Sequence, residues 1–451
     1  MKEHYPIRVM ELFAGVGGFH LGFKRVNEKF DKELFKVVWA NQWEPSRKSQ
    51  EAFECYKYHF AHEFESEDDI VNEDIAKIPD EVFVRYRPDL VVGGFPCQDY
   101  SVARSLSGEK GIEGKKGVLF WEIKRVLENT HPKYVLLENV DRLLKSPSKQ
   151  RGRDFAIMLA TFRDLDYSVE WRVINAAEYG HAQRRRRVFI FAYKNYLPYA
   201  KSQKKKKMEQ VIFKDGFFAP KFPVHEIPDN GRIDSDVLPE DIVYISDKYS
   251  FNFYNAGIMI EGMFMTAQVI PDGVEPTPLK EIVIHDEVDE KYYLTPEQEE
   301  KFKFLRGPKK IPRKGPNGVT YYYSEGGMSP TDDLDKPGRT MLTSEGTVNR
   351  SSHIIEINGR KRFLTPLECE RLNEFDDNWT DTGMSDRMRY FCMGNALVVG
   401  LIQKMGLRLL DVEETNQHVD DGIPGDSTDY ETGLKSHVYK QITLFDDIAI
   451  K

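Results

Sequence analysis

A cysteine lies within the short segment Gly93 to Gln98, which reads Gly-Gly-Phe-Pro-Cys-Gln. The run before it, Asp89 to Val92, is short and mostly apolar, as a buried strand requires. Most cysteines lie in apolar cores, but one in a loop at a strand end sits on a rigid support at the mouth of a site. We therefore interpret Cys97 as a nucleophile, with a buried structural thiol as the alternative.

A carboxylate and an arginine cluster accompany two other apolar runs. Glu138 lies at the end of the run that starts at Tyr134, where burial favours a protonated carboxyl group that can hold or donate a proton. A carboxylate that only caps a helix is the alternative. Arginines occupy positions 184–187, just before the next apolar run, and strand alternation sends Arg185 and Arg187 to one face. Four like charges are often a solvated surface, but at a strand start they indicate a nearby anion.

Two further segments offer groups for a ligand. The turn from Phe13 to Gly18 is rich in glycine and lets a ligand approach the backbone before a helix begins. A nucleotide-dependent oxidoreductase or a plain tight turn would use the same residues. The segment Asn41 to Glu44 supplies hydrogen-bonding groups for ribose hydroxyls and an aromatic ring, Trp43, for a base. The alternative is a tryptophan packed on the sheet edge beside a solvated glutamate.

These segments follow short apolar runs that alternate with helical patterns over the first two hundred residues. One helical pattern places Leu119, Ile123, Val126 and Leu127 on one face. Such alternation predicts an α/β fold with a doubly wound, mostly parallel sheet, whose ligands gather beyond the carboxyl ends of the strands. The expected strands are Ile7 to Phe13, Lys36 to Ala40, Asp89 to Val92, Tyr134 to Leu137, Trp171 to Ile174 and Arg187 to Tyr193.

From residue 199 the chain becomes irregular and rich in aromatic residues, proline, glycine and aspartate, which predicts a second domain. Two capping boxes, at Thr295 and Thr365, predict helix starts, and Asn317-Gly318 predicts a hairpin turn. Apolar residues at helical spacing between 395 and 410 predict a helix that returns to the first domain. Beyond 411 the chain is polar and acidic, which predicts a disordered tail.

Composition narrows the function classes. The 451 residues carry a net charge of −9, yet residues 142–207 hold seventeen basic against five acidic residues, which permits a polyanionic partner. The four cysteines form no C-x-x-C pair, so neither a disulfide framework nor a metal site is expected. No apolar run is long enough for a membrane span and no secretory signal is visible, so we expect a cytoplasmic, nucleoid-associated protein.

Five segments, in their order and separations, resemble the motifs of the DNA (cytosine-5) methyltransferases of the bacterial and phage modification type. The likeness spans about residues 7–200 and 363–408. The segments are Phe13 to Gly18, Pro96-Cys97-Gln98, Glu138-Asn139-Val140, Gln183 to Arg187 and Gly394-Asn395-Ala396.

The resemblance implies a Rossmann-like class I methyltransferase with a smaller target-recognition domain. It implies a catalytic domain over 1–198, the recognition domain over 199–364, a hinge and return over 365–410 and a flexible tail over 411–451. The implied reaction transfers a methyl group from S-adenosylmethionine to C5 of cytosine within a short recognition sequence of double-stranded DNA.

The resemblance also implies roles for the reactive residues. Cys97 would add as a thiolate to C6 of an extruded cytosine, and Arg185 would favour that thiolate through its charge. Glu138 would hold N3 and the exocyclic amine, and Arg187 the O2 edge. The family likeness places the cofactor against Phe13, Gly15, Gly17, Gly18, Trp43, Asp74, Ile75, Phe95, Leu119, Asn395 and Ala396. In relatives an acidic residue precedes the aromatic one, whereas here Gln42 does and Glu44 follows, so the ribose ligand stays open between them.

DNA contacts are expected around the site and in the second domain. The loop from Ser105 to Gly117 is expected to close over the extruded base. Expected contacts are Gln98, Ser101, Lys309, Lys310, Arg313, Arg339 and Thr340. We expect a monomer on DNA.

A short motif near the C-terminus, with Gln441, Leu444 and Phe445, resembles peptides that dock on the bacterial sliding clamp; a strand that folds back on the protein is the alternative. Three other functions are weighed. An RNA (tRNA) cytosine-5 methyltransferase tends to lack so large a second domain, an oxidoreductase leaves Cys97 and the arginines unexplained, and a silent DNA-binding regulator needs no complete catalytic set.

Overall fold

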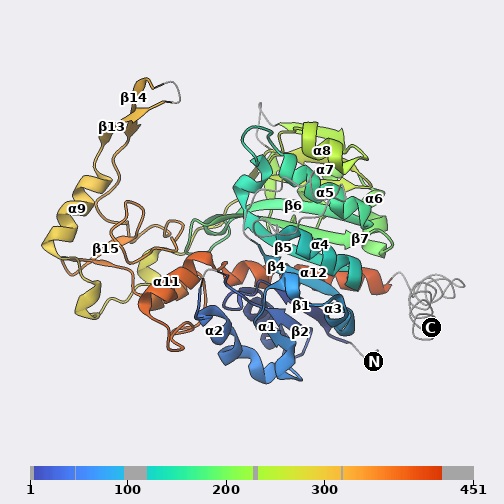
Figure 1. Ribbon diagram of the computed structural model, residues 1–451, viewed down its shortest axis with the longest axis horizontal. Coiled ribbons are helices and arrows are strands. Elements are labelled where there is room, and N and C mark those ends of the chain that lie inside the picture. Colours follow the sequence, from blue (N-terminus) through green and yellow to red (C-terminus); the bar gives the residue numbers. More distant parts are fainter. Residues whose placement is uncertain (1–4, 46, 96–118, 227–231, 316–317, 419–451) are drawn as a thin grey trace, which may run out of the picture.

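The computed structural model describes residues 5–45, 47–95, 119–226, 232–315 and 318–418. A large lobe surrounds a central sheet, and a smaller lobe, to the left in Figure 1, is joined to it through the segment that carries α11 (Asp386–Asn395). The six strands expected from the sequence all form, within a few residues of their predicted ends. The doubly wound α/β prediction is confirmed.

The central sheet has the order β3-β2-β1-β4-β5-β7-β6-β10-β11-β9. Strands β1 to β5 run parallel, and β7 is inserted antiparallel between β5 and β6. The carboxyl ends of β1, β2, β4 and β5 therefore meet the start of β7 at one edge. The bounds are β1 Ile7–Leu12, β2 Phe35–Asn41, β3 Ile70–Val71, β4 Leu90–Gly94, β5 Tyr134–Val140, β6 Tyr167–Asn175 and β7 Arg186–Lys194.

Helices cover both faces of this sheet, and the strand residues alternate between two apolar clusters. One face of β1 and β2 packs with α1 (Gly18–Phe30), α2 (Glu51–Phe60) and α12 (Val399–His418). The other face packs with α3 (Asp80–Tyr86), α4 (Leu119–Thr130) and α5 (Arg153–Asp164). The sheet is thus buried on both sides, as a mostly parallel sheet requires.

The sheet does not end with β7 and β6. Strand β10 (Ala256–Ile260) pairs antiparallel with β6, then β11 (Met263–Ala267) and β9 (Ile233–Val237) follow. Glu261 and Gly262, both with positive φ, form the tight turn between β10 and β11. The sequence prediction missed these strands, so the division at residue 198/199 stays a prediction while the sheet itself runs on past it.

The segments that connect these strands are short. After β7 come α6 (Pro198–Lys204), α7 (Met208–Gln210) and the π-helical turn η6 (Val211–Asp215). Strand β8 (Val224–Glu226) pairs with β12 (Val269–Pro271), and α8 (Ile242–Lys248) packs near α5.

The smaller lobe holds little regular structure. Its elements are η7 (Leu279–Glu281), η8 (Glu290–Tyr292), α9 (Pro296–Arg306), β13 (Lys309–Lys314), β14 (Thr320–Glu325), β15 (Ile354–Ile357) and β16 (Arg360–Phe363). The capping box at Thr295 is confirmed at the start of α9. The hairpin β13–β14 is present, whereas Asn317 of its predicted turn lies outside the described residues.

The chain returns to the large lobe through α10 (Pro366–Leu372), capped at Thr365 as predicted, then α11 and α12. Helix α12 continues to His418, which corrects the prediction of a tail from 411. The buried face of α12 continues past Leu410, because Val412 is fully buried. Asn416, one turn further, accepts a hydrogen bond from the Tyr199 amide at 2.8 Å. Residues 419–451 lie outside the described part of the chain.

One described helical stretch, Asp386–Gln417, is long and apolar enough by length and composition to cross a membrane. Of its apolar window, 67% is buried inside the protein. This is weak evidence for a span, because core helices pass the same test.

Candidate active site

An arginine and a glutamate from neighbouring antiparallel strands meet at the carboxyl edge of the sheet. Arg187 on β7 pairs with Val140 on β5, so its side chain lies on the same face as Glu138 two residues earlier. The Arg187 Nε lies 2.8 Å from Glu138 Oε1, and both side chains are largely buried. Insertion of β7 beside β5 is therefore what brings the two predicted residues together.

Arg185 adds a second cation on that side, and it is more deeply buried. Its Nη2 donates to the carbonyl of Gly394 at 3.0 Å, while Nε and Nη1 have no hydrogen-bond partner among the described residues. Burial, and then the nearby Arg187, lower the pKa of this guanidinium to about 9. A buried cation with free N–H groups can receive an anion or a carbonyl oxygen.

The end of β4 is fastened to the end of β5 beside these groups. The Asn139 side chain donates to the Phe95 carbonyl at 2.8 Å. A Cβ on Gly94 would lie 3.1 Å from Glu138 Oε2, and one on Gly93 would lie 2.8 Å from the Leu12 carbonyl oxygen, so glycines permit this close approach. Cys97, Gln98, Ser101 and the loop Ser105 to Gly117 lie outside the described residues, although the chain enters that segment from Phe95.

The glycine turn after β1 has one open position and two packed ones. Gly15 has φ +59, and a Cβ there would meet no atom of the described residues within 4 Å. Gly17 would place a Cβ 2.3 Å from the Phe60 ring, and Gly18 would place one 2.9 Å from Leu397. Gly17 and Gly18 are therefore needed for helix packing, and Gly15 is the position whose backbone faces open space.

Gln42 is tied to this turn. Its Oε1 accepts a hydrogen bond from the Gly15 amide at 2.7 Å, which leaves its amide nitrogen as the group to face a ligand. The backbone N–H of Glu44 donates to Gln50 instead, at 2.8 Å. Trp43 is half-buried, with Lys77 Nζ 5.7 Å from its ring centroid.

The remaining predicted cofactor residues lie on the segments around this edge. Asp74 caps a 3₁₀ turn, η3 (Ile75–Lys77), by accepting from the Ala76 amide at 3.1 Å, and Ile75 is buried. Leu119 is half-buried at the start of α4, and Asn395 at the end of α11 is exposed, followed by Ala396. The segment around Asn395 thus lies between the Gly394 carbonyl at Arg185 and Leu397 at the glycine turn.

The sequence of residues 7–411 matches the family model of the C-5 cytosine-specific DNA methylases. A type II methyltransferase of Staphylococcus aureus, M.Sau3AI, is 55% identical over 407 residues, which are 90% of this chain and 96% of that protein. The chain belongs to the C-5 cytosine-specific DNA methylases. Its reaction is therefore methyl transfer to C5 of cytosine in DNA, and the family resemblance drawn from the sequence is confirmed.

More distant relatives agree. M.HhaI of Haemophilus parahaemolyticus, also a type II methyltransferase, is 30% identical over half of this chain and 61% of its own length. The solved structure of the Dnmt2 methyltransferase of S. pombe matches with a TM-score of 0.56 at 14% identity, over 90% of this chain and 99% of that chain. At that identity the match shows the fold, the Rossmann-like methyltransferase fold predicted from the sequence.

One buried residue of the arginine motif has a joining role that the sequence did not indicate. Gln183 donates to Asn373 Oδ1 at 2.7 Å and accepts from the Met341 amide at 3.1 Å. Asn373 in turn donates to the Met393 carbonyl at 2.7 Å. Gln183 therefore links the catalytic sheet of this methylase to the small lobe and to the returning chain.

Two residues predicted to contact DNA are engaged inside the small lobe. Arg339 donates to Asp332 at 2.6 Å and to the carbonyls of Ser351 and Ser352, and Lys309 donates to the Leu305 carbonyl at 2.7 Å and pairs with Glu325. Their side-chain donors hold the lobe together, which does not favour the predicted direct contacts. The Thr340 hydroxyl donates to the Arg184 carbonyl at 2.6 Å, so this threonine joins the lobe to the arginine motif.

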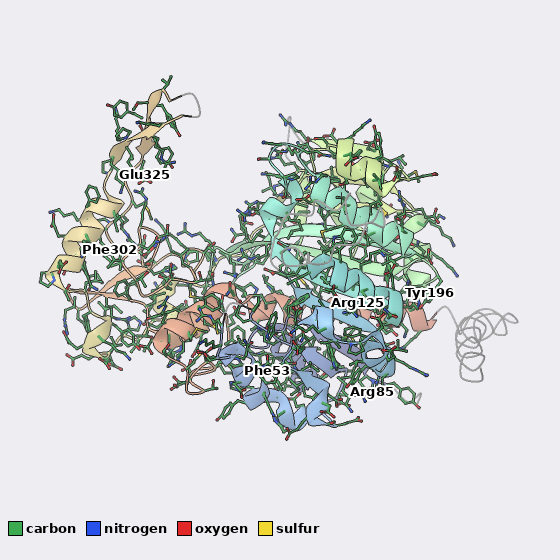
Figure 2. All side chains as sticks on the ribbon, in the orientation of Figure 1. Phe53, Arg85, Arg125, Tyr196, Phe302 and Glu325 are labelled. Carbon is green, nitrogen blue, oxygen red and sulfur yellow. The ribbon has the colours of Figure 1, made fainter. Side chains whose placement is uncertain are left out.

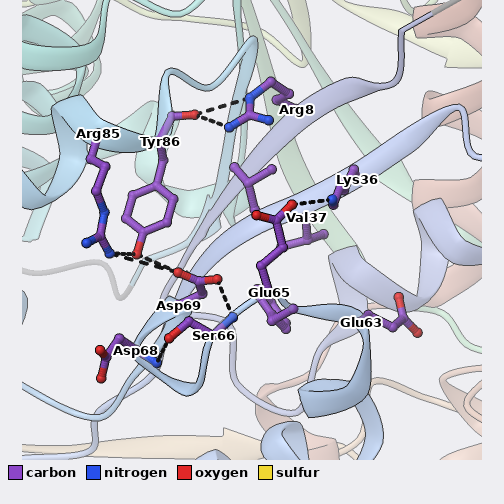
Figure 3. Close-up of a pocket in the computed structure, with 12 residues that line it drawn as sticks. Arg8, Lys36, Val37, Glu63, Glu65, Ser66, Asp68, Asp69, Arg85 and Tyr86 are labelled. Carbon is purple, nitrogen blue, oxygen red and sulfur yellow. Dashed lines mark hydrogen bonds and ion pairs between the residues drawn. The ribbon is translucent and has the colours of Figure 1, made fainter.

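One cavity formed by the described residues lies away from this edge. It measures about 330 Å³ and is lined by residues near the starts of β1 and β2, such as Arg8 and Lys36. Figure 3 shows contacts between its lining side chains: Lys36 donates to Glu65, and the Tyr86 hydroxyl donates to Asp69. This is the amino edge of the sheet, opposite Glu138, so the cavity is no part of the site.

Proposed function

We propose that this methylase takes its methyl group from S-adenosylmethionine and acts through a covalent intermediate on Cys97. The Cys97 thiolate adds to C6 of cytosine, which makes C5 nucleophilic. After C5 is methylated, it loses its proton and the C6–sulfur bond breaks, so that the thiolate leaves and the aromatic ring is restored.

The observation that carries this proposal is the ion pair of Glu138 and Arg187 beside the half-satisfied Arg185. Glu138 would hold N3 and the exocyclic amine of the ring, and Arg187 would hold O2. Arg185 would stabilise negative charge that develops on the sulfur or the ring. All three project where β4 leads into the segment that contains Cys97.

The groups at the carboxyl ends of β1 and β2 fit the methyl donor. The open space at Gly15 allows backbone contact, Trp43 offers a ring for adenine, and Asp74 and Ile75 lie next along the edge. The amide nitrogen of Gln42 has no hydrogen-bond partner among the residues that the structure describes, which favours Gln42 over Glu44 at the ribose. S-adenosylmethionine would supply an electrophilic methyl group there, and Phe13, Phe95, Leu119, Asn395 and Ala396 would line the rest.

The substrate proposed is double-stranded DNA at a short sequence, in a restriction-modification setting, as the type II relatives suggest. A stacked base cannot reach Glu138, so the cytosine would rotate out of the duplex at a cost of a few kcal/mol. The protein would act in the cytoplasm on the nucleoid, as a monomer.

Transfer of tritiated methyl from S-adenosylmethionine to duplex DNA and to tRNA tests the proposal. We expect label in duplex DNA, sensitive to its sequence, and none in tRNA. Label in tRNA alone would favour the RNA enzyme instead, and label in neither would contradict the proposal.

A second proposal concerns the C-terminal motif of Gln441, Leu444 and Phe445, which would dock on the sliding clamp. A pull-down with purified clamp tests it. Capture that is lost when Leu444 and Phe445 become alanine supports docking, and equal capture of both forms contradicts it.

A further inference from the structure

The hairpin of β13 and β14 stands free of the rest of the protein. In Figure 1 it projects from the small lobe, beyond α9, and Figure 2 shows its side chains extending to both sides with Glu325 near its base. Each strand is six residues long. A two-stranded hairpin is marginally stable alone, so a free one that carries large side chains needs a partner to bury them.

Both faces of the hairpin carry exposed aromatic rings. Cross-strand register places Tyr321 and Tyr323 on one face and Tyr322 on the other. Tyr322 is 69% exposed, Tyr321 49% and Tyr323 40%. A partner with a flat surface would cover only one of these faces.

Each face also carries a positive charge without an acidic partner. Among the described residues no ion pair involves Lys310, Arg313 or Lys314, and Arg313 instead stacks on Tyr323, 4.1 Å from the ring centroid. Lys309 differs, because it pairs with Glu325 at the base. The far part of the hairpin is therefore purely cationic, with Arg313 on one face and the two lysines on the other.

We infer that this hairpin inserts into the major groove of the substrate duplex, with Lys310, Arg313 and Lys314 on phosphates and the tyrosines against the groove walls. The inference rests on the proposed DNA substrate. Paired strands lie about 4.8 Å apart, and the major groove is about 12 Å wide and admits a two-stranded ribbon. A groove covers both faces at once, which a flat partner does not.

The reach of the hairpin sets the size of the expected contact. Six residues at about 3.3 Å each extend about 20 Å, which matches about six base pairs along the groove. The hairpin belongs to a lobe joined to the arginine motif through Thr340. Its contacts would therefore extend the footprint continuously from the site of methylation.

The test compares the triple variant Lys310→Ala, Arg313→Ala, Lys314→Ala with a matched triple variant, Lys29→Ala, Lys32→Ala, Arg87→Ala. The control removes the same charge from exposed positions at or just beyond the carboxyl ends of α1 and α3, near the amino edge of the sheet and outside the basic stretch 142–207. Affinity for a duplex is measured by fluorescence anisotropy over a range of salt concentrations. Three lost phosphate contacts should reduce the slope of log K against log salt by about 2 to 3, and the control should match the wild type.

Dimethyl sulfate protection then locates the contact, since guanine N7 lies in the major groove. Tyr322→Ala and the hairpin triple variant should each lose N7 protections that the wild type and the control retain. A slope unchanged from the control overturns the inference. A reduced slope with all N7 protections intact also overturns it, because the hairpin would then lie on the backbone.

Methyl transfer separates this inference from the proposed function. The hairpin variants should need a higher concentration of duplex DNA than the wild type for half-maximal methyl transfer, because they lack contacts to the substrate. A wild type that methylates DNA while the variants bind like the control refutes only the hairpin. A wild type that does not methylate DNA refutes the function itself.

Discussion

The arginines at positions 185–187 have different surroundings although they adjoin in sequence. Arg185 is buried, and two of its nitrogens have no hydrogen-bond partner within the described part of the chain. Arg187 pairs with Glu138, and the Arg186 Nε lies 3.3 Å from Asp141 Oδ2 on the outer side. Alternation along a strand predicts this division, because it needs only the direction of each side chain. The side chains that the site uses could thus be separated from the solvated one by sequence alone.

The Arg187→Ala variant should lose at least about 100-fold in kcat/KM, since it removes a charged hydrogen-bond donor from the reacting ring and leaves Glu138 unpaired. Arg186→Ala is the matched control from the same strand and should stay within a few-fold of the wild type. Tritiated methyl transfer measures both, and circular dichroism checks their folding. Equal losses in the two variants would contradict the role given to Arg187.

Roles that depend on partners far away in sequence could not be predicted. Gln42 stands where relatives of the family have an acidic residue. A hydrogen bond from the Gly15 amide, 27 residues earlier, fixes the orientation of the Gln42 side chain. From the sequence, Arg339 is expected to contact DNA. In the fold its guanidinium donates hydrogen bonds to Asp332 and to two backbone carbonyls. In each case the tertiary fold supplies a partner that neither charge nor spacing reveals.

At the scale of elements, strand β1 carries a buried glutamate below the start of α1. Burial raises the pKa of Glu11 to about 8, against hydrogen bonds from Tyr56 and from the backbone of His20. Tyr56 also contacts His20, which reaches Glu63 at 3.1 Å. The protonated carboxyl group therefore stabilises the packing of β1, α1 and α2.

This glutamate makes folding stability fall as the pH rises. Because the folded state binds the Glu11 proton more tightly than the unfolded state, its contribution is complete below about pH 4.5 and is lost as the pH rises towards about 8. Glu11→Gln should remove about 2 to 3 kcal/mol of the decrease in unfolding free energy between about pH 6 and pH 8. Urea unfolding at both pH values measures it.

Glu54→Gln, an exposed change on the neighbouring helix α2, is the control and should follow the wild type. Part of the decrease should persist in Glu11→Gln, since burial also raises the pKa of Glu170 to about 7. An unchanged pH dependence in Glu11→Gln would show that Glu11 is ionised throughout.

Elements differed in how well the sequence predicted them. The parallel strands β1, β4 and β5 are buried on both faces and read as apolar runs, so their pattern was plain. Strand β9 at the sheet edge reads Ile-Asp-Ser-Asp-Val and is exposed throughout, and β10 and β11 follow an irregular stretch. Their place in the sheet depends on pairing with β6, which local sequence does not specify.

At the scale of the whole molecule, α12 closes the chain onto the catalytic sheet. It packs along α1, and its last turns reach β5 and α6, where Glu413 accepts from the Tyr134 hydroxyl at 2.5 Å. The final residues of the helix are polar on their outer face, which is why the sequence suggested a tail.

Two truncated forms of the chain test whether residues 411–418 belong to the folded helix or to a flexible tail. Ending the chain at 410 should lower the unfolding free energy by about 2 to 4 kcal/mol relative to ending it at 418, because Val412 and the Asn416 and Glu413 hydrogen bonds are lost. Chemical denaturation of the two forms measures the difference. Equal stabilities would show that residues 411–418 contribute nothing to the fold.

The central claim is that the sulfur of Cys97 bonds to the target cytosine. Duplex DNA that contains 5-fluorocytosine tests it most directly, because fluorine cannot leave as the C5 proton does, and peptide mapping locates the bond. The wild type with S-adenosylmethionine should yield a stable protein–DNA adduct on Cys97, and Cys97→Ser should yield none while still binding DNA. An active wild type that forms no adduct, or one attached through another residue, would contradict the account.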